Sequence, residues 1–193
     1  PLLLQAAVNS AAGATANVTV IINHLRSLGS VNDAAPAPAG LCAGPNFTSN
    51  GDRVRRKRQQ QAEFLANLIQ ARQVGNPTEN IIVVGDFNAF EVNDGYGDSM
   101  GVIIGSPAAD AATLVPGDGV DLVTPDLVNL GIAASNPLAE RYSYVFDGNA
   151  QNLDHALVSA SVIAAAPTTR LEHARINADF GEDNRSDPLI PVR

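Results

Sequence analysis

The stretch IIVVGDFNAF at 81–90 ends an apolar, β-branched run with a carboxylate and a carboxamide two positions apart, Asp86 and Asn88. Residues i and i+2 of an extended chain lie on the same side. We therefore expect these two side chains to point into one space while Phe87 turns toward the core, an arrangement that indicates a site. The alternative is that the polar residues only form a turn after a strand.

Two further polar clusters lie near expected strands. His24 follows the alternating, β-branched stretch 17–22, and Asp154 lies in LDHALVS at 153–159. The clusters are too far apart in the sequence to form a local motif. In α/β folds the ends of strands commonly meet, so we expect one sheet to bring the clusters together.

These residue types suit metal-assisted phosphodiester hydrolysis. Asp86 could orient or deprotonate a water molecule, and Asn88 could donate its amide protons to a developing phosphorane oxygen. A histidine such as His24 could stabilise or protonate the same group.

The elements that must position these residues alternate between strand and helix. The stretches 17–22 and 81–84 predict strands, and a helix is expected between them at 53–73. In that helix apolar residues recur at helical spacing, namely Ala62, Leu65, Ala66 and Ile69, flanked by Phe64 and Leu68. Strand, helix and strand in this order predict α/β layer packing. Later, 142–146 and 153–159 predict an antiparallel hairpin.

Several charged or polar residues have simpler interpretations. The basic run at the helix start is interpreted as a solvated face, with contact to a phosphate backbone as the alternative; it comprises Arg53, Arg55, Arg56, Lys57 and Arg58. His155 should point away from Asp154 and be structural, and His173 is expected at the surface. The acidic loop does not have EF-hand spacing and is assigned to loop structure, with cation binding as the alternative; it contains Glu91, Asn93, Asp94 and Asp98.

Composition limits the class of protein. A chain of 193 residues with 45% hydrophobic and 17% charged residues is typical of one globular domain. No apolar run approaches the roughly 20 residues of a membrane span. The net charge of −8 argues against binding nucleic acid by bulk electrostatics. An enzyme that recruits a divalent cation can nevertheless be acidic and act on phosphates.

Three ordered motifs resemble the endonuclease/exonuclease/phosphatase superfamily, which has the deoxyribonuclease I-like fold. They are NHLRS at 23–27, GDFNA at 85–89 and LDHALVS at 153–159. The chain is most similar to bacterial extracellular nuclease-like members, as RYSYVFDGNAQNLDHALVS at 141–159 and FNAFEVNDGYGD at 87–98 also indicate. The resemblance covers nearly the whole chain from Asn17 onward.

The resemblance implies a two-sheet α/β sandwich flanked by helices, with a divalent-cation-dependent site at one edge. His24 would contact the scissile phosphate and assist proton transfer, and Asp86 would orient the attacking water. Asn88 would bind substrate and stabilise the transition state, while Asp154 would fix a second histidine. Asp86 and Asn88 are the expected ligands of Mg²⁺, with Mn²⁺ or Ca²⁺ as alternatives.

Two parts of the family pattern have no counterpart in this sequence. The family ends with Ser-Asp-His-x-Pro, whereas Ser186 and Asp187 are followed here by Pro188. The metal-binding Glu expected upstream of His24 has no candidate in 1–16. We therefore expect 1–193 to be one partial domain that lacks both ends and cleaves nucleic acid poorly by itself.

The resemblance predicts a monomeric nuclease acting on DNA or RNA, secreted or periplasmic. One alternative is a non-catalytic binding module with the same fold. The other is a phosphatase or phosphodiesterase acting on lipid or inositol phosphates, because loops determine the substrate in this superfamily.

Overall fold

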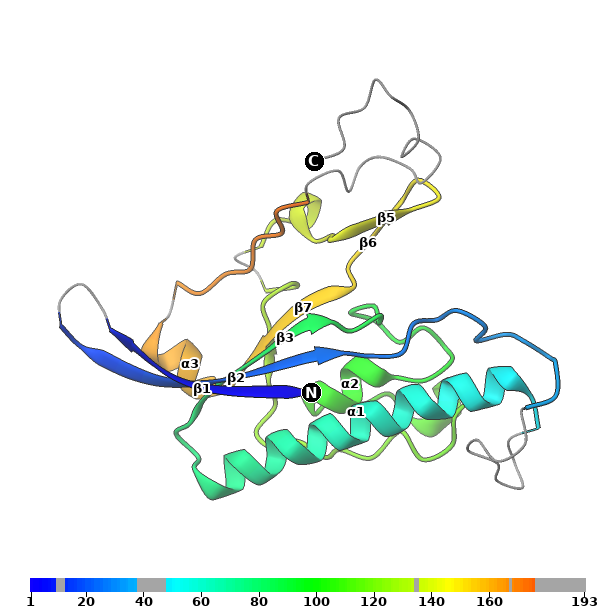
Figure 1. Ribbon diagram of the computed structural model, residues 1–193, viewed down its shortest axis with the longest axis horizontal. Coiled ribbons are helices and arrows are strands. Elements are labelled where there is room, and N and C mark those ends of the chain that lie inside the picture. The colour runs from blue at the N-terminus through cyan, green and yellow to red at the C-terminus, as the bar shows by residue number, and fades with distance from the viewer. Residues whose placement is uncertain (10–12, 38–47, 134–135, 167, 176–193) are drawn as a thin grey trace.

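A mixed five-stranded sheet forms the centre of the computed structural model, which describes residues 1–9, 13–37, 48–133, 136–166 and 168–175 (Figure 1). Its order is β1 (Leu2–Asn9), β2 (Thr15–His24), β3 (Asn80–Asp86), β7 (Asp154–Val158) and β4 (Val128–Asn129). Only β2 and β3 are parallel; the other neighbours are antiparallel. A second sheet pairs β5 (Tyr144–Phe146) with β6 (Asn149–Gln151).

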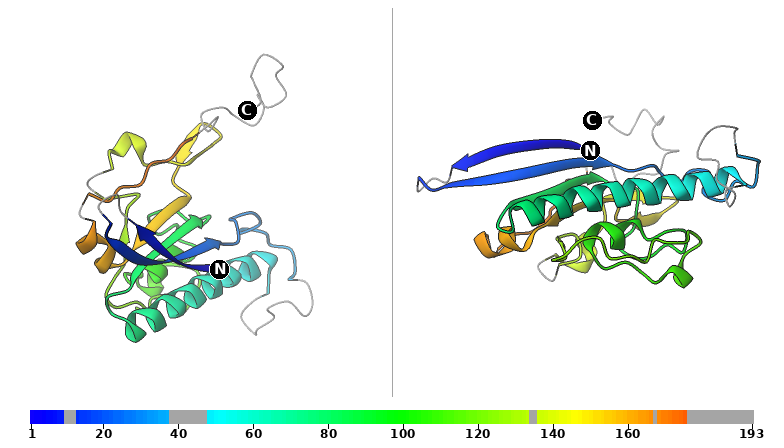
Figure 2. Two further views of the ribbon diagram at one scale, coloured as in Figure 1. Left: turned by 60° about the vertical axis from the view of Figure 1, so that its left-hand side comes forward. Right: turned by 90° about the horizontal axis from the view of Figure 1, so that it is seen from below.

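In the described ranges the sheets are accompanied by three α-helices, α1 (Asn50–Gly75), α2 (Ser99–Ile104) and α3 (Ala160–Ala165). Two short 3₁₀ helices, η1 (Asp110–Ala112) and η2 (Leu138–Glu140), lie in the connections. The long helix α1 connects the parallel strands β2 and β3, and it lies along the sheet beside α2 (Figures 1 and 2). No helix in the described part of the chain is long and apolar enough to span a membrane.

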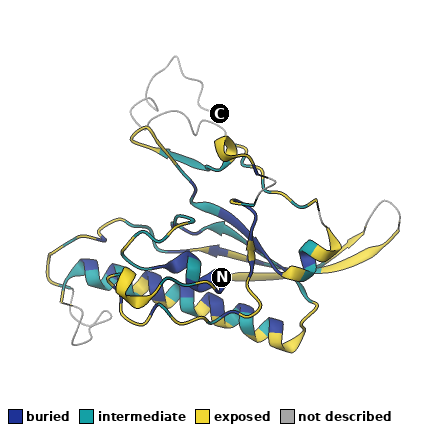
Figure 3. Ribbon diagram, turned by 180° about the vertical axis from the view of Figure 1, so that it is seen from behind, coloured by how far each residue is buried: buried dark blue, intermediate teal, exposed yellow. Residues whose placement is uncertain are grey.

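Strand β3 has apolar side chains on both faces, which explains its uninterrupted β-branched run. Ile81 and Val83 are fully buried in the core that α1 and α2 share with the sheet. Ile82 and Val84 are partly buried in a second cluster on the other face, which includes Val162 of α3. Period-two alternation thus places β3 between two apolar layers, and the buried residues gather around it (Figure 3).

Helix α1 packs as its sequence predicts but begins earlier than the expected residue 53, at Asn50. Ser49 and Asp52 form a capping box, in which each side chain accepts a hydrogen bond from the other's backbone N–H. The residues expected on the core face are buried, namely Ala62, Leu65, Ala66 and Ile69. Of the flanking pair, Leu68 is half-buried, whereas Phe64 is 60% exposed.

The α/β class is confirmed, with a multistranded sheet, a second small sheet and flanking helices. The expected hairpin between 142–146 and 153–159 is wrong in its pairing. The turn at Asp147 and Gly148 instead joins β5 to the short strand β6, while β7 pairs with β3 and β4. Strand β1 and helix α2, which we did not predict, complete the sheet edge and the core beside α1.

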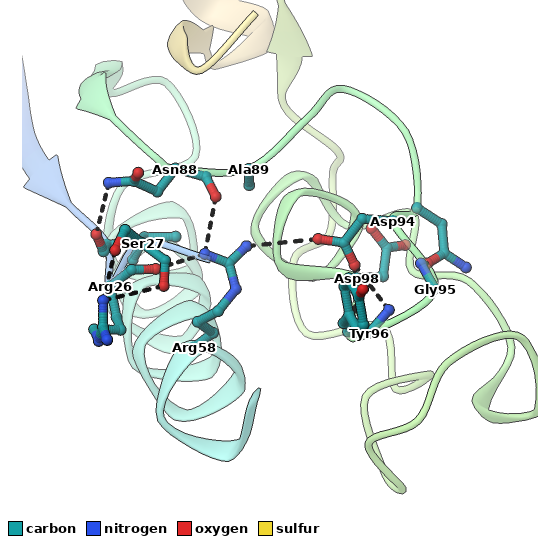
Figure 4. Close-up of polar contacts among 12 residues, drawn as sticks. Arg26, Ser27, Arg58, Asn88, Ala89, Asp94, Gly95, Tyr96 and Asp98 are labelled. Atoms are coloured by element: carbon teal, nitrogen blue, oxygen red, sulfur yellow. Dashed lines mark hydrogen bonds and ion pairs between the residues drawn. The ribbon is translucent and has the colours of Figure 1, made fainter. Parts of the chain in front are cut away.

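A buried arginine connects α1 to the loops that follow β2 and β3. Arg58 is 3% exposed, and its Nη1 donates to the carbonyl oxygens of Arg26 at 2.5 Å and Asn88 at 2.8 Å. Its Nη2 lies 3.8 Å from Asp94 Oδ2 (Figure 4). Burial lowers the pKa of Arg58, and the charge of Asp94 opposes that change. The prediction of a solvated face is therefore wrong at this position.

We expect Arg58→Met to lower the free energy of unfolding by about 3–5 kcal/mol, because it leaves two carbonyl groups without their donor and the buried Asp94 carboxylate without the cation that faces it. Urea unfolding followed by circular dichroism measures the change. The matched control is Lys57→Met, one residue away and exposed, which should change stability by less than about 0.5 kcal/mol. Equal losses of unfolding free energy in the two variants would contradict the role of Arg58 in connecting α1 to the loops after β2 and β3.

Candidate functional site

Three of the four predicted site residues form one row across the sheet. His24 is the register partner of Asp86 in the parallel pair of β2 and β3, and Asp86 is the partner of Asp154 in the antiparallel pair of β3 and β7. Register partners point to the same face. His24 Nε2 lies 3.5 Å from Asp86 Oδ2, with side chains 73% and 39% exposed. The sheet thus brings the three motifs together where β2 and β3 end.

Gly85 permits β2 and β3 to approach each other beside this row. Its φ is 143°, a conformation that side-chain-bearing residues rarely adopt. A Cβ at this position would lie 1.9 Å from the carbonyl oxygen of Asn23. The glycine of the GDFNA motif is therefore required by the backbone geometry immediately before Asp86.

Asn88 is held beside Asp86 by a different geometry from the one expected. The strand ends at Asp86, and Asn88 has a left-handed backbone with φ of 46°. Its N–H donates to Asp86 Oδ1 at 2.7 Å, and its Nδ2 donates to the Leu25 carbonyl at 3.1 Å. With the Arg58 contact to its carbonyl group, both backbone groups and the side-chain amide of Asn88 are positioned.

Asp154 is anchored through its backbone. Its N–H donates to Ser143 Oγ at 3.0 Å, and its carbonyl oxygen lies 2.9 Å from His173 Nε2. His173 is half-buried, so the expectation of a surface histidine is wrong. The predicted contact of Asp154 with a second histidine stays a prediction, because the histidine of the family motif has no counterpart in this sequence.

His155 has the structural role expected of it. It is 2% exposed, its Nε2 lies 2.9 Å from the Ala89 carbonyl oxygen, and its Nδ1 lies 3.2 Å from Asn129 Nδ2. Burial lowers the pKa of His155, which favours the neutral ring. Phe87 meets this ring edge to face at 5.7 Å and is fully buried, as predicted. Together they support the loop that carries Asn88.

Two carboxylates of the acidic loop, Asp94 and Asp98, make structural contacts. Asp94 Oδ1 accepts from the backbone N–H groups of Tyr96 and Gly97 at 2.9 and 3.3 Å, while its other oxygen faces Arg58. Asp98 caps the start of α2 by accepting from Gly101 N–H at 3.0 Å. The loop thus holds Arg58 and α2 in place, in agreement with the assignment to loop structure (Figure 4).

Asp86 and Asn88 carry oxygen donors of the kind that hard cations prefer, although the described residues contain no group of three or more His, Cys, Asp or Glu side chains that could hold a metal ion. Asn88 N–H donates to Asp86 Oδ1 at 2.7 Å, so the two residues expected as ligands lie next to each other. Mg²⁺ binds proteins through one or two carboxylates and keeps several waters. Asp86 and Asn88 are therefore of the donor type that suits such an ion.

Sequence reasoning missed two supporting residues of α1, Arg58 and Gln61. Gln61 Oε1 accepts the N–H of Arg26 at 2.9 Å, while Arg58 binds the Arg26 carbonyl group. The backbone N–H and carbonyl groups of Arg26, two positions after His24, are thus both held by side chains of α1. The helical spacing of Arg58 from buried Val54 and Ala62 was a signal that could have placed its side chain inside.

No protein-family model matches the chain, and no curated protein does. Among solved structures, the chain is similar to a β-hairpin deletion mutant of beta toxin from Staphylococcus aureus, with 14% sequence identity and a TM-score of 0.36. The match covers 82% of this chain and 44% of the toxin chain. This chain therefore spans less than half the length of the protein that it matches.

Proposed function

We propose that the chain carries catalytic residues of a divalent-cation-dependent phosphodiester hydrolase, a nuclease that acts on DNA or RNA. The observation that supports this most is the cross-strand row of His24, Asp86 and Asp154, with Asn88 held against Asp86. An imidazole, two carboxylates and an amide at one end of a sheet can supply the proton transfers and the charge stabilisation that hydrolysis needs.

Asp86 is the residue proposed to orient the attacking water. Its Oδ1 accepts from Asn88 N–H, while its Oδ2 faces His24. The water oxygen forms a bond to phosphorus as the bond from phosphorus to the leaving oxygen breaks. The water gives up a proton, which Asp86 can accept, and the leaving oxygen must gain one. His24 is exposed enough to reach a bound phosphate and is proposed to assist this proton transfer.

Asn88 is proposed to bind substrate and to stabilise the transition state. One amide proton is engaged by Leu25, and the second remains for a developing phosphoryl oxygen. A bound divalent cation, with Asp86 and Asn88 as proposed ligands, would neutralise charge on the phosphoryl oxygens. Asp154 is proposed to support the site from the adjoining strand.

We expect Asp86→Asn to lower kcat by about 100- to 10,000-fold with a small change in KM, because its role lies in the transition state. Asn88→Ala should lower kcat by about 100- to 1,000-fold, the usual effect of losing one transition-state donor. Steady-state kinetics of the full-length protein on plasmid DNA, RNA and bis(p-nitrophenyl) phosphate measure both, and the three substrates also compare nucleic acid with a small diester.

The matched control is Asp147→Asn, the same change in the exposed turn between β5 and β6, which should leave kcat within about two-fold. Near-normal kcat in Asp86→Asn on every substrate would show that the GDFNA segment is a turn and that the proposed function is wrong.

We expect a chelator to abolish hydrolysis by the full-length protein, and Mg²⁺ or Mn²⁺ to restore it. The fold should persist without the ion, because the described core consists of apolar residues between the sheet and the helices. Activity and far-ultraviolet circular dichroism in the same samples check both statements. Full activity in excess chelator would contradict the proposed use of a cation.

A further inference from the structure

The structure separates the five cations of the basic run into different environments. Arg55 is paired with Asp52 at 2.5 Å, and Arg56 lies 2.6 Å from Gln59 Oε1 and 4.0 Å from Glu63. Arg58 is buried. Arg53 and Lys57 remain, and these two line a pocket together with His24.

That pocket has a volume of about 400 Å³ and lies beside the candidate site. Three of its lining residues, His24, Lys57 and Gln61, also line an adjoining hollow of about 310 Å³. Arg53, Gln60 and Phe64 complete the side of the pocket that α1 provides. No carboxylate is among the described residues that line either hollow.

The residues from α1 form a continuous row. Arg53, Lys57 and Phe64 follow one another at i, i+4 and i+11, which places them on one helix face. At 1.5 Å per residue the row is roughly 16 Å long. Arg53 donates to the neutral Asn50 Oδ1 at 2.9 and 2.7 Å, so this hydrogen bond does not cancel its charge.

The row combines positive charge with an exposed aromatic ring, in a chain whose net charge is −8. Phe64 is 60% exposed at the end of the row. Cations that follow a backbone, next to an aromatic ring on which a base stacks, are the features by which proteins bind single strands. In a duplex the bases stack on one another and cannot lie against Phe64.

We infer that this face of α1 binds a single-stranded segment of the substrate, with Arg53 and Lys57 on phosphates and Phe64 against an unpaired base. The inference rests on the proposed function and names its substrate class. His24, which belongs to both the pocket and the catalytic row, places the scissile phosphate at one border of this segment.

Binding of a fluorescein-labelled 15-nucleotide single strand, followed by anisotropy in chelator, tests the inference in the full-length protein. Lys57→Ala should weaken binding and reduce the slope of log affinity against log salt by about 0.7, the value for one contact to a single strand. Phe64→Ala should weaken binding by about 5- to 100-fold and leave the affinity for a blunt duplex nearly unchanged.

The matched controls are Arg170→Ala, which removes a cation 65% exposed outside the row, and Phe146→Ala, which removes an aromatic ring 48% exposed. Both should bind the single strand within about two-fold of the parent protein. The inference is overturned if Lys57→Ala equals Arg170→Ala, or if Phe64→Ala weakens duplex binding equally. Phe64-dependent binding to anionic phosphatidylserine vesicles in place of the oligonucleotide would also overturn it, since the row would then be a membrane contact.

Hydrolysis of bis(p-nitrophenyl) phosphate separates this inference from the proposed function. The small diester has no base for Phe64 and no chain of phosphates. If Asp86→Asn abolishes hydrolysis of the small diester while Lys57→Ala and Phe64→Ala leave oligonucleotide binding unchanged, the inference alone fails. If Asp86→Asn leaves its hydrolysis intact, the proposed function fails.

Discussion

The hydrogen-bonded register of β2, β3 and β7 is the constraint on which the candidate site depends. His24, Asp86 and Asp154 come from distant parts of the chain, and only this register makes them neighbours. A slip of one residue would turn every side chain of β3 to the opposite face. Because β3 is apolar on both faces, burial alone would not oppose such a slip strongly. The close approach at Gly85, where only glycine fits against Asn23, adds a steric reason for the observed alignment.

Helix α1 connects the proposed catalytic residues to the proposed substrate surface. Its inner side holds the loops that follow β2 and β3. Gln61 accepts a hydrogen bond from the backbone N–H of Arg26, and Arg58 donates to the carbonyl oxygens of Arg26 and Asn88. Its outer side carries the row that ends at Phe64. Because both sides belong to one helix, α1 determines the distance between the surface that would bind the strand and the groups that would act on it.

The sequence predicted the parts of the fold that local patterns determine. An alternating pattern located β2, an uninterrupted β-branched run located β3, and apolar residues at helical spacing located α1. Polarity near the strand ends indicated the four candidate site residues. The pairing of β5 was not predictable in the same way. The strand that pairs with β5, NAQ at 149–151, is short and polar, whereas the expected partner β7 has the stronger strand pattern. The charge of Arg58 favours an exposed position, although its helical spacing places it on the buried side. A buried guanidinium is stable only with partners such as the two carbonyl groups and the Asp94 carboxylate, and tertiary structure supplies these.

Asn88 is held in a defined position although it lies beyond the end of β3. A left-handed backbone is tolerated by Asn better than by most residues, and here Asp86, Arg58 and Leu25 each bind a different group of Asn88. Asp86 contributes with one oxygen only and keeps the other toward His24. The fold therefore already orients the polar groups of Asn88 and Asp86. Under the proposed function, a bound phosphoryl group would meet dipoles that need not reorganise. Electrostatic stabilisation of a transition state is most effective under this condition.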